Sequence, residues 1–475
     1  MKKKRIYLMI EIKKRELEAR LYFAYIASLK GYSVVIANKG EIWLKRNFLR
    51  PGIVIFKSLG PNNTKLIDDI KKAGHEVVAW DEEAFVTPKE ISFFVKKRIL
   101  KENLLKLKYF FSWGEIEYEY LCKEFPEFKD NIIKTGNSRV DILKKKFSNV
   151  LDHEVNEIRE KCGQFTLFLG NFPSINNFYY DDGECMSDVL HKQGTFKKGG
   201  KENNYVLRNE KSMKDVFRLL PDFFKKYSKK FPDNTLIIRP HPVEKIEPYV
   251  KMISGLKNIQ IISDDRNALS WIKASDIMIS SNCTTSVEAF LLERSNINFF
   301  VSKDLKDQEF YLPSIVSTNT NSVEETINLL ENIYNKSFSN EFINNSDKID
   351  IHYKNVKRAL YNYDENICSV SEMLIHLDKI NVNNNRDDKK INKIFFYYLF
   401  LRSHLGRLKR KISFIFKSKK DKRTEKYLRK KMIGFDFKEV TKKLKLIIQA
   451  GKKDKKNFKV KELIPKIFCV ENIEK

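Results

Sequence analysis

Short apolar runs alternate with longer segments of helical character along roughly the first 150 residues. The runs have the length of buried strands, whereas the segments between them, such as Arg15–Ser28, repeat apolar residues at helical spacing. Strands that alternate with helices predict a parallel, doubly wound sheet. The expected strands are Lys4–Ile10, Ser33–Ala37, Gly52–Phe56, Glu76–Ala79, Tyr109–Ser112 and Asn131–Thr135.

The same alternation starts again after a charged helical stretch, Asp141–Cys162. A polar insert, Tyr179–Asn204, interrupts this second series and has the composition of a loop or flap. Two successive α/β units of about 150 residues predict two Rossmann-like lobes, residues 1–155 and 160–345, with a cleft between them. The strands expected in the second lobe are Phe165–Leu169, Thr235–Ile238, Ile259–Ile262, Ile277–Ile279 and Asn296–Phe300.

The remainder of the chain is expected to be helical and strongly basic. A closing helix at 350–380 leads through a polar linker to a basic α-helical module, residues 385–475. From Asn381 to Lys475 there are 30 Lys and Arg against 10 Asp and Glu, a net charge of +20 out of +28 for the whole chain. Within it, Ile394–Phe416 mixes aromatic and basic residues in the manner of a helix at an anionic membrane surface. The alternatives are a basic hairpin packed on the lobes and a nucleic-acid-binding segment.

Composition limits the class of protein. A chain of 475 residues, 42% of them hydrophobic, is long enough for two or three globular domains. Its six cysteines are widely spaced and form no CxxC pair, which argues against a disulfide framework or a zinc site. The apolar runs Ile6–Ile10 and Ile394–Leu401 are too short for a signal peptide and a membrane span, respectively. We therefore expect a cytoplasmic protein.

The segment LIIRPHP, Leu236–Pro242, is the first candidate site. Pro240 cannot continue a central strand, so the strand ends there and leaves Arg239 and His241 beyond its carboxyl end. Open α/β sheets bind ligands at this edge, and a cation beside an imidazole suits a phosphate group. The alternative is a proline-rich turn with a solvated Arg and His.

A run of hydroxyl residues, Ser280–Ser286 (SSNCTTS), is the second candidate. It lies between an apolar strand and a helical segment, where hydroxyls and backbone N–H groups at a helix N-terminus can bind an anion. An ordinary N-cap is the alternative, although a cap needs only one or two of these hydroxyls.

Three consecutive carboxylates, Asp81, Glu82 and Glu83, form the third candidate. They follow the strand EVVA in the first lobe, and their mutual repulsion is expected to raise the pKa of at least one of them, as a general base requires. An acidic helix N-terminus is the alternative. Residues with weaker signals could contact donor or acceptor, namely Asn171, Glu288, Glu11, Lys14 and Arg15.

These three motifs, in this order, resemble those of bacterial surface carbohydrate biosynthesis proteins. This family of GT-B glycosyltransferases is related to sialyl-, polysialyl- and capsule Kdo-transferases, which share acidic, HP and Ser/Thr motifs. The N-terminal IYLMIEIKKRELEARL and the segment TGNSRVD, Thr135–Asp141, are also similar to the family. The resemblance covers roughly residues 1–320. Ala84 stands where the family's acidic motif often has Gly, which leaves the alignment of the individual carboxylates open.

The resemblance implies a role for each motif. His241, Pro242 and Arg239 would contact the nucleotide phosphate and stabilise the departing nucleotide. Asp81, Glu82 or Glu83 would deprotonate the acceptor hydroxyl, and Glu82 or Glu83 is favoured for this role. The same phosphate would be bound by the Ser/Thr motif, namely Ser280, Ser281, Thr284 and Thr285. The donor would be a CMP-activated acidic sugar, a nonulosonate or Kdo, and the acceptor a lipid-linked glycan or surface polysaccharide such as capsule or lipopolysaccharide.

The chemistry of such a transfer is consistent with these residues. Positive groups placed where the leaving phosphate gains charge lower the barrier, and a base on the opposite face of the sugar gives inversion in a single displacement. No DxD-type carboxylate pair lies near the anion motifs, so neither a metal nor a further cofactor is expected. The enzyme would act at the inner face of the cell membrane, to which the basic tail would bind, and nucleic acid is not an expected partner.

Three alternatives remain open. A CDP-polyol phosphotransferase of the teichoic-acid type shares the HP and Ser/Thr motifs but usually has a His in its first lobe. Outside the connecting stretch, the only histidine in the first lobe of this chain is His75, which lies ahead of a strand. A GT-B-fold sugar epimerase is the second alternative. The third is a nonenzymatic protein that binds membrane or nucleic acid, for which replacement of His241 would have little effect.

Overall fold

The computed structural model describes residues 3–84, 98–194, 199–264, 266–302, 305, 308–335, 354–383, 387, 434–452 and 457–474. The chain forms two compact units. Unit 1 contains the described residues up to 84, from 98 to 150 and from 357 onward. Unit 2 contains those from 151 to 356.

Unit 1 is built on an eight-stranded sheet in the order β13-β14-β2-β1-β3-β4-β5-β6. The strands from β2 to β6 in this order run parallel, so the carboxyl ends of these six strands lie along one edge. Burial on both faces explains why β1 reads as an unbroken apolar run. The strands are β1 (Arg5–Ile10), β2 (Ser33–Asn38), β3 (Ile53–Phe56), β4 (Glu76–Ala79), β5 (Phe110–Ser112), β6 (Ile132–Lys134), β13 (Phe458–Ile464) and β14 (Ile467–Asn472).

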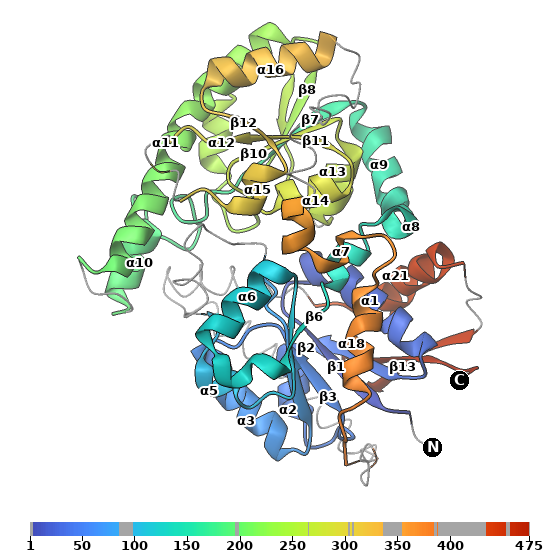
Figure 1. Ribbon diagram of the computed structural model, residues 1–475. Helices are drawn as coiled ribbons and strands as arrows, with labels where there is room; N and C mark the ends of the chain where they lie inside the picture. The colour runs from blue at the N-terminus through green and yellow to red at the C-terminus, as the bar shows by residue number, and fades with distance from the viewer. Residues whose placement is uncertain are drawn as a thin grey trace, which may run out of the picture. The chain divides into compact units, whose positions relative to one another are not determined.

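The C-terminal strands correct the expectation of a wholly helical basic module. Strand β14 pairs antiparallel with β2, and β13 pairs with β14, so the hairpin extends the sheet of unit 1 (Figure 1, red beside blue). The physical reason is the alternation of Lys459 and Lys461 with Phe458 and Val460, which is a strand pattern that the high charge of the region obscures. Only α21 (Phe437–Ala450) is a helix among the described residues after 433, and it packs against α1 (Lys13–Leu29).

The expected closing helix is also divided. Its described part has a helical segment at 354–359, a 3-10 turn at Tyr361–Tyr363 and α18 (Ser369–Leu377). The remaining helices of unit 1 are short and lie between the strands. They are α2 (Lys39–Lys45), α3 (Thr64–Lys72), α5 (Lys101–Leu104), α6 (Glu115–Glu124), α7 (Ser138–Asp141) and α8 (Lys145–Ser148), with 3-10 turns at Pro61–Asn63, Pro126–Asn131 and Asn149–Leu151.

A buried polar network explains why the chain breaks there. Asn362 donates to Asp141 Oδ1 (2.6 Å) and to the carbonyl of Asn137 (3.0 Å), and Ser369 donates to Asp141 Oδ2. Gly136, with φ +76°, approaches so closely that a Cβ would lie 2.0 Å from Asn362 Oδ1. The TGNSRVD segment therefore joins the main part of unit 1 to its C-terminal helices.

Unit 2 contains a six-stranded parallel sheet in the order β12-β11-β10-β7-β8-β9. The chain builds β7, β8 and β9 outward in one direction and then returns to place β10 on the other side of β7. The strand order therefore reverses between β7 and β10. The strands are β7 (Phe165–Leu169), β8 (Thr235–Arg239), β9 (Ile259–Ile261), β10 (Ile277–Ser280), β11 (Ser295–Phe299) and β12 (Thr318–Thr320).

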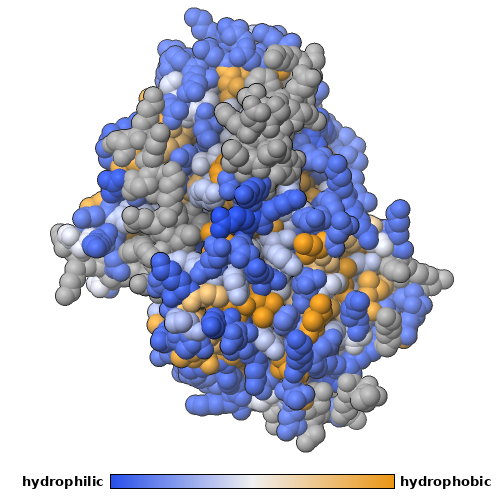
Figure 2. Space-filling view, in the orientation of Figure 1, coloured by the Kyte–Doolittle hydropathy of each residue, from blue (hydrophilic) through white to orange (hydrophobic). Residues whose placement is uncertain are grey.

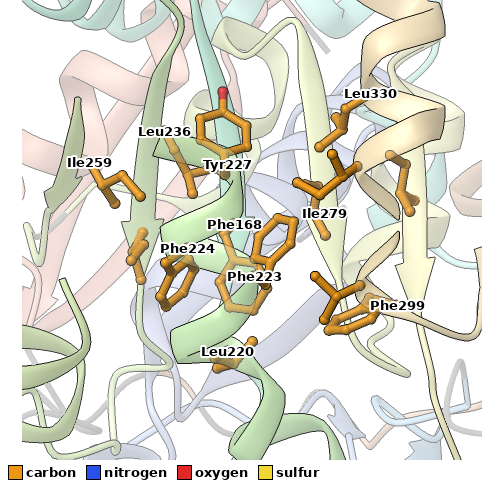
Figure 3. Packing of buried hydrophobic residues seen from close by; sticks show 14 of the residues in the cluster. Phe168, Leu220, Phe223, Phe224, Tyr227, Leu236, Ile259, Ile279, Phe299 and Leu330 are labelled. Atoms are coloured by element: carbon orange, nitrogen blue, oxygen red, sulfur yellow. The ribbon is translucent and has the colours of Figure 1, made fainter. Parts of the chain in front are cut away.

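Aromatic side chains of the long helix α11 (Lys201–Lys230) fill the core of unit 2. Phe223, Phe224 and Tyr227 are fully buried, and Figure 3 shows Phe223 and Phe224 packed beside Phe168 of β7. Phe223 also contacts Phe299 of β11. Burial of such rings dominates the energetics of a core. The other helices of unit 2 are α9 (Asp152–Cys162), α10 (Met186–Lys192), α12 (Glu247–Met252), α13 (Ala268–Ala274), α14 (Thr285–Leu291), α15 (Tyr311–Ile315) and α16 (Val323–Asn335).

The polar insert differs from the expected loop. Helix α10 lies within it and packs against α11, and the buried carboxylate of Glu210 accepts hydrogen bonds from the N–H (2.6 Å) and hydroxyl (2.9 Å) of Ser187. The proposed interfacial helix Ile394–Phe416 lies outside the described residues. In the part of the chain that is described, no helix combines the length and the apolar character needed to cross a bilayer. Hydrophilic residues cover most of the face seen in Figure 2.

Candidate functional site

The RPHP turn begins where β8 ends, at the carboxyl edge of the sheet of unit 2. Arg239 is only 11% exposed and is held by Asp264 (Nη2 to Oδ1, 3.0 Å), by the carbonyl of Arg266 and by the ring of Trp271. Burial lowers the pKa of Arg239 and the charge of Asp264 opposes this effect. We therefore assign Arg239 to holding the end of β8 rather than to binding a phosphate.

His241 and Pro242 lie beyond the strand and are exposed. The backbone N–H of Val243 approaches Nδ1 of His241 at 3.4 Å. When Nδ1 accepts this hydrogen bond, the hydrogen of a neutral imidazole lies on Nε2, which can then donate to a ligand. Of the two basic residues in the motif, His241 is thus the one that the turn presents to solvent.

Glu244, three residues later, is an additional member of the turn that the sequence did not suggest. Its carboxylate is buried and accepts hydrogen bonds from Tyr249 Oη (2.5 Å) and from the backbone N–H groups of Phe172 (2.9 Å) and His241 (3.3 Å). Burial raises the pKa of Glu244 to about 7, and these hydrogen bonds oppose the rise. The turn after β8 is therefore bonded to the loop after β7.

Asn171 joins the loop after β7 to the Ser/Thr turn after β10. Its side-chain amide donates to the carbonyls of Ser281 (3.2 Å) and Asn282 (3.1 Å). Asn282 has φ +47°, a conformation that Asn tolerates better than most residues, and its amide bonds to the carbonyl of Gln308 and to the N–H of Phe310. The two motifs, about forty residues apart in sequence, are thus linked through the loop after β7.

The hydroxyls of the Ser/Thr turn fall into two groups. Ser280 is fully buried and hydrogen-bonded to Ser286 (3.0 Å), and Ser281 is also buried. Thr284 and Thr285 are partly exposed. Thr284 therefore carries the accessible hydroxyl, whereas the hydroxyl oxygen of Thr285 is buried and Ser280 stabilises the turn. Glu288 is buried in α14, where its charge adds to the effect of burial in raising the pKa of Cys283.

The acidic motif occupies the carboxyl edge of the sheet of unit 1, directly after β4. Glu82 is 2% exposed and forms an ion pair with the buried Arg20, and its Oε1 lies 3.8 Å from Arg139. Although burial alone would raise the pKa of Glu82, the charges of Arg20 and Arg139 hold it well below the usual range. A carboxylate so strongly stabilised in its ionised form is a poor base.

Asp81 differs from Glu82 in its partners. It pairs with Arg98 (3.0 Å) and accepts the N–H of Glu83 (3.0 Å), and burial raises its pKa. Glu117, in the first turn of α6, accepts the N–H of Trp113 (2.7 Å). Burial, together with the charge of Asp81, raises the pKa of Glu117 to about 8. Asp81 and Glu117 are therefore two carboxyl groups with a raised pKa, and the charge of Asp81 adds to the rise at Glu117, whereas Glu83 is exposed.

The weaker candidates at the end of β1 belong to an ion-pair network. Glu11 pairs with Lys39 (2.8 Å) and Lys57 (2.9 Å), and these charges lower its pKa to about 2 although burial would raise it. Arg15 lies 3.7 Å from Glu16. Within the described residues, no group of three or more His, Cys, Asp or Glu is arranged to hold a metal ion.

Comparisons with known proteins bear mainly on the fold. No curated protein matches the sequence. A family model described as "Protein of unknown function (DUF354)" matches residues 212–365, about a third of the chain. A Listeria monocytogenes protein described as a UDP-N-acetylglucosamine 2-epimerase has a similar structure, with a TM-score of 0.50 at 12% identity, over 81% of this chain and 99% of that one.

Two further structures are less similar. A variant of the wall teichoic acid polymerase TagF has a TM-score of 0.47 at 13% identity, over 80% of this chain and 88% of that one. A glycosyltransferase from Rickettsia africae ESF-5 has a TM-score of 0.43 at 12% identity, over 80% and 100% of the two chains. At such identities the likeness concerns the fold alone. Together with the two parallel sheets, the Listeria structure confirms the expected α/β class with two Rossmann-like lobes.

Proposed function

We propose that this protein is a glycosyltransferase that binds the phosphate of a nucleotide-activated sugar at the carboxyl edge of the sheet of unit 2. One observation carries the proposal. The loop after β7 is bonded through Asn171 to the Ser/Thr turn after β10 and through Phe172 to Glu244 of the turn after β8. The two candidate anion-binding turns therefore flank the loop after β7, beside the point between β7 and β10 where the strand order reverses. Open α/β sheets bind ligands at such points.

In this proposal two polar groups receive the phosphate. They are Nε2 of His241 and the hydroxyl of Thr284. A sugar–phosphate bond that breaks leaves negative charge on the departing nucleotide, and fixed donors at that place stabilise the transition state more than the ground state. Arg239 and Ser280, which are occupied by Asp264 and Ser286, hold the two strand ends in position.

The donor and acceptor follow from the motif order rather than from the geometry. An acidic motif followed by the HP and Ser/Thr motifs resembles transferases that use CMP-activated acidic sugars, and we propose a nonulosonate or Kdo donor and a surface-polysaccharide acceptor. Transfer to a hydroxyl needs a base. We assign this role to the Asp81–Glu117 pair instead of to Glu82, because a raised pKa lets a carboxyl group exchange a proton near neutral pH. The proposed reaction uses no metal.

A panel of nucleotides tests the phosphate site. CMP, CDP, UDP and GDP would be titrated calorimetrically into the wild-type protein, His241→Ala and the control His153→Ala, an exposed histidine of α9 in the same unit. We expect CMP to bind the wild type and the control alike, and His241→Ala to bind it about tenfold or more weakly. Tighter binding of UDP would contradict the CMP donor, whereas turnover of CDP-polyols would favour the phosphotransferase.

Turnover with the identified donor tests the base. We expect Asp81→Asn and Glu117→Gln to lose about 100-fold or more in kcat. Glu119→Gln, which changes an exposed carboxylate on α6 that pairs with Arg358, is the matched control. Full activity in both Asp81→Asn and Glu117→Gln would refute the assignment.

We further propose that the C-terminal region binds an anionic membrane surface. Lys438, Lys442 and Lys445 are exposed and spaced by four and three residues, so they form one face of α21. Each basic residue near such a surface contributes about 1 kcal/mol. Replacement of all three by Glu should abolish salt-sensitive binding to vesicles rich in phosphatidylglycerol, whereas the same change at Lys225, Lys229 and Lys251, exposed residues of unit 2, should not. Equal binding by both triple variants would contradict the proposal.

A further inference from the structure

Glu244 is a buried acid with an unusual set of partners. It is 2% exposed, and its carboxylate accepts hydrogen bonds from Tyr249 Oη and from the N–H groups of Phe172, in the loop after β7, and His241, in its own turn. A buried carboxylate that accepts backbone N–H groups from two loops fixes the distance between those loops. The side chain of Asn176, in the loop after β7, makes a second link by donating to the carbonyl of Lys245 (3.0 Å).

The surrounding backbone is built to admit this carboxylate. A Cβ at Gly170 would lie 2.7 Å from Tyr249 Oη and 3.1 Å from Glu244 Oε2, so only glycine leaves the space that the pair needs. The two loops also pair directly, through Phe178 N to the carbonyl of Val243 (3.0 Å) and Lys245 N to that of Asn176 (2.9 Å). Glu244 lies at the inner end of this contact, next to His241.

The third loop is within the electrostatic reach of Glu244. Burial raises the pKa of Cys283 in the Ser/Thr turn, and the charges of Glu288 and Glu244 add to the rise. Asn171, one residue before Phe172, bonds to the carbonyls of that same turn. A shift of the loop after β7 would therefore move both anion-binding turns.

We propose that Glu244 is a positioning residue that ties the loop after β7 to the turn after β8. It thereby holds His241 where it binds the donor phosphate and Asn171 where it bonds to the Ser/Thr turn. The expected effect of Glu244 on phosphate binding rests on the proposed function, whereas the connection that Glu244 makes between the two loops does not depend on it. Glu244 is not expected to touch the sugar or the phosphate. Glu244 affects binding indirectly, through the backbone N–H groups of Phe172 and His241 that donate hydrogen bonds to its carboxylate.

Hydrogen exchange of the protein without nucleotide tests the joining of the loops. In Glu244→Ala the N–H groups of Phe172 and His241 lose their acceptor, and we expect about tenfold or greater loss of protection in peptides covering 170–176 and 240–245. Glu244→Gln keeps a carbonyl oxygen for both N–H groups and should retain protection. Glu247→Gln, an exposed acid of α12, is the matched control. Unchanged protection in Glu244→Ala would overturn the inference.

The same variants then connect the loops to ligand binding. We expect CMP to bind Glu244→Ala about tenfold or more weakly than the wild type, and Glu244→Gln to be close to it. If Glu244→Ala fails to fold, Tyr249→Phe, which removes a single donor, should give partial loss of protection and affinity together. Equal CMP affinity in all variants would overturn the positioning role, whereas no nucleotide binding by the wild type, with the protection pattern as expected, would refute the proposed function instead.

The pH dependence of binding gives a readout that a purely structural residue would not change. A phosphate bound near Glu244 favours the protonated carboxyl, so affinity in the wild type should rise as pH falls from about 8 to about 6. The titratable and charged groups around Glu244 are Tyr249 of α12, His241 and Lys245 of the turn, and Cys283 and Glu288 beyond β10. Because histidine side chains in general can take up a proton in this pH range, the comparison is with Glu244→Gln, whose dependence should be weaker. Identical slopes would count against the inference.

Discussion

Replacement of Glu82 by Gln tests whether this carboxylate is a structural ion-pair partner. The change keeps the shape of the side chain but removes the charge that compensates Arg20, which is 1% exposed, and Arg139, which is 8% exposed. Loss of one partner of a buried ion pair leaves an uncompensated charge and costs about 3–5 kcal/mol. The indole of Trp80 donates to Glu82 Oε2 (2.8 Å) and also lies beneath Arg20, so the tryptophan should report the change directly.

Urea unfolding followed by tryptophan fluorescence provides the assay. Three of the four tryptophans (residues 43, 80 and 113) lie in unit 1, so the signal reports mainly that unit. Because the pKa of Glu82 is lowered, its stabilising effect is fully present above the ordinary carboxyl pKa and is lost as pH falls below it. The difference between wild type and Glu82→Gln should therefore be full at pH 7 and shrink below about pH 4.

Glu83→Gln is the matched control, since Glu83 is exposed and should change stability by about 0.5 kcal/mol or less. A Glu82→Gln variant as stable as this control would refute the structural assignment. Loss of turnover in a Glu82→Gln protein that remains fully stable would instead restore Glu82 as the base.

Three other variants probe separate parts of the account. Because burial raises the pKa of Glu117 to about 8, wild-type stability should decline as pH rises from about 4.5 to 8, and Glu117→Gln should be the more stable protein at pH 9, as urea unfolding at pH 5 and pH 9 would show. Phe223→Ala removes a fully buried ring from the core of unit 2 and should cost about 3–5 kcal/mol, measured by the urea dependence of hydrogen exchange in peptides of α11. Gly136→Ala combines φ +76° with a clash against Asn362 and should destabilise unit 1 by more than about 1 kcal/mol in the tryptophan-fluorescence urea assay. An unchanged urea midpoint in any of these three variants would contradict the burial or packing from which its prediction was made.

Local pattern was enough to predict the strands β1 to β11, with ends within one residue of those observed, whereas the short β12 (Thr318–Thr320) was not expected. Pro240 marks the end of β8, and the hydroxyl run marks the turn after β10, because these signals lie within a few residues of the feature they indicate. The hairpin β13–β14 was missed because its period-two pattern lies in a region dominated by Lys, which was interpreted from charge alone.

The roles of individual charges could not be predicted in this way, because their partners lie far away in the sequence. Three adjacent carboxylates look alike until Arg20 and Arg139, each about sixty residues distant, bind Glu82 and leave Asp81 to Arg98. Arg239 similarly meets Asp264, which is 25 residues later.

The sequence pattern around the two unexpected carboxylates, Glu117 and Glu244, is ambiguous. Glu117 stands in the first turn of a helix after a strand, where acidic residues commonly serve the helix dipole. Glu244 follows the HP motif by three residues, a short spacing that could have been noticed, but only its burial and its three donors distinguish it from a solvated acid.

Hydrogen exchange with and without CMP tests the central claim most directly. The account predicts that saturating CMP protects three separated peptides of unit 2, those covering 170–176, 240–245 and 281–286, and that His241→Ala removes this protection. Protection confined to other segments, or no change in these three loops at a CMP concentration that saturates binding, would contradict the claim that the carboxyl edge of this sheet is the nucleotide-phosphate site.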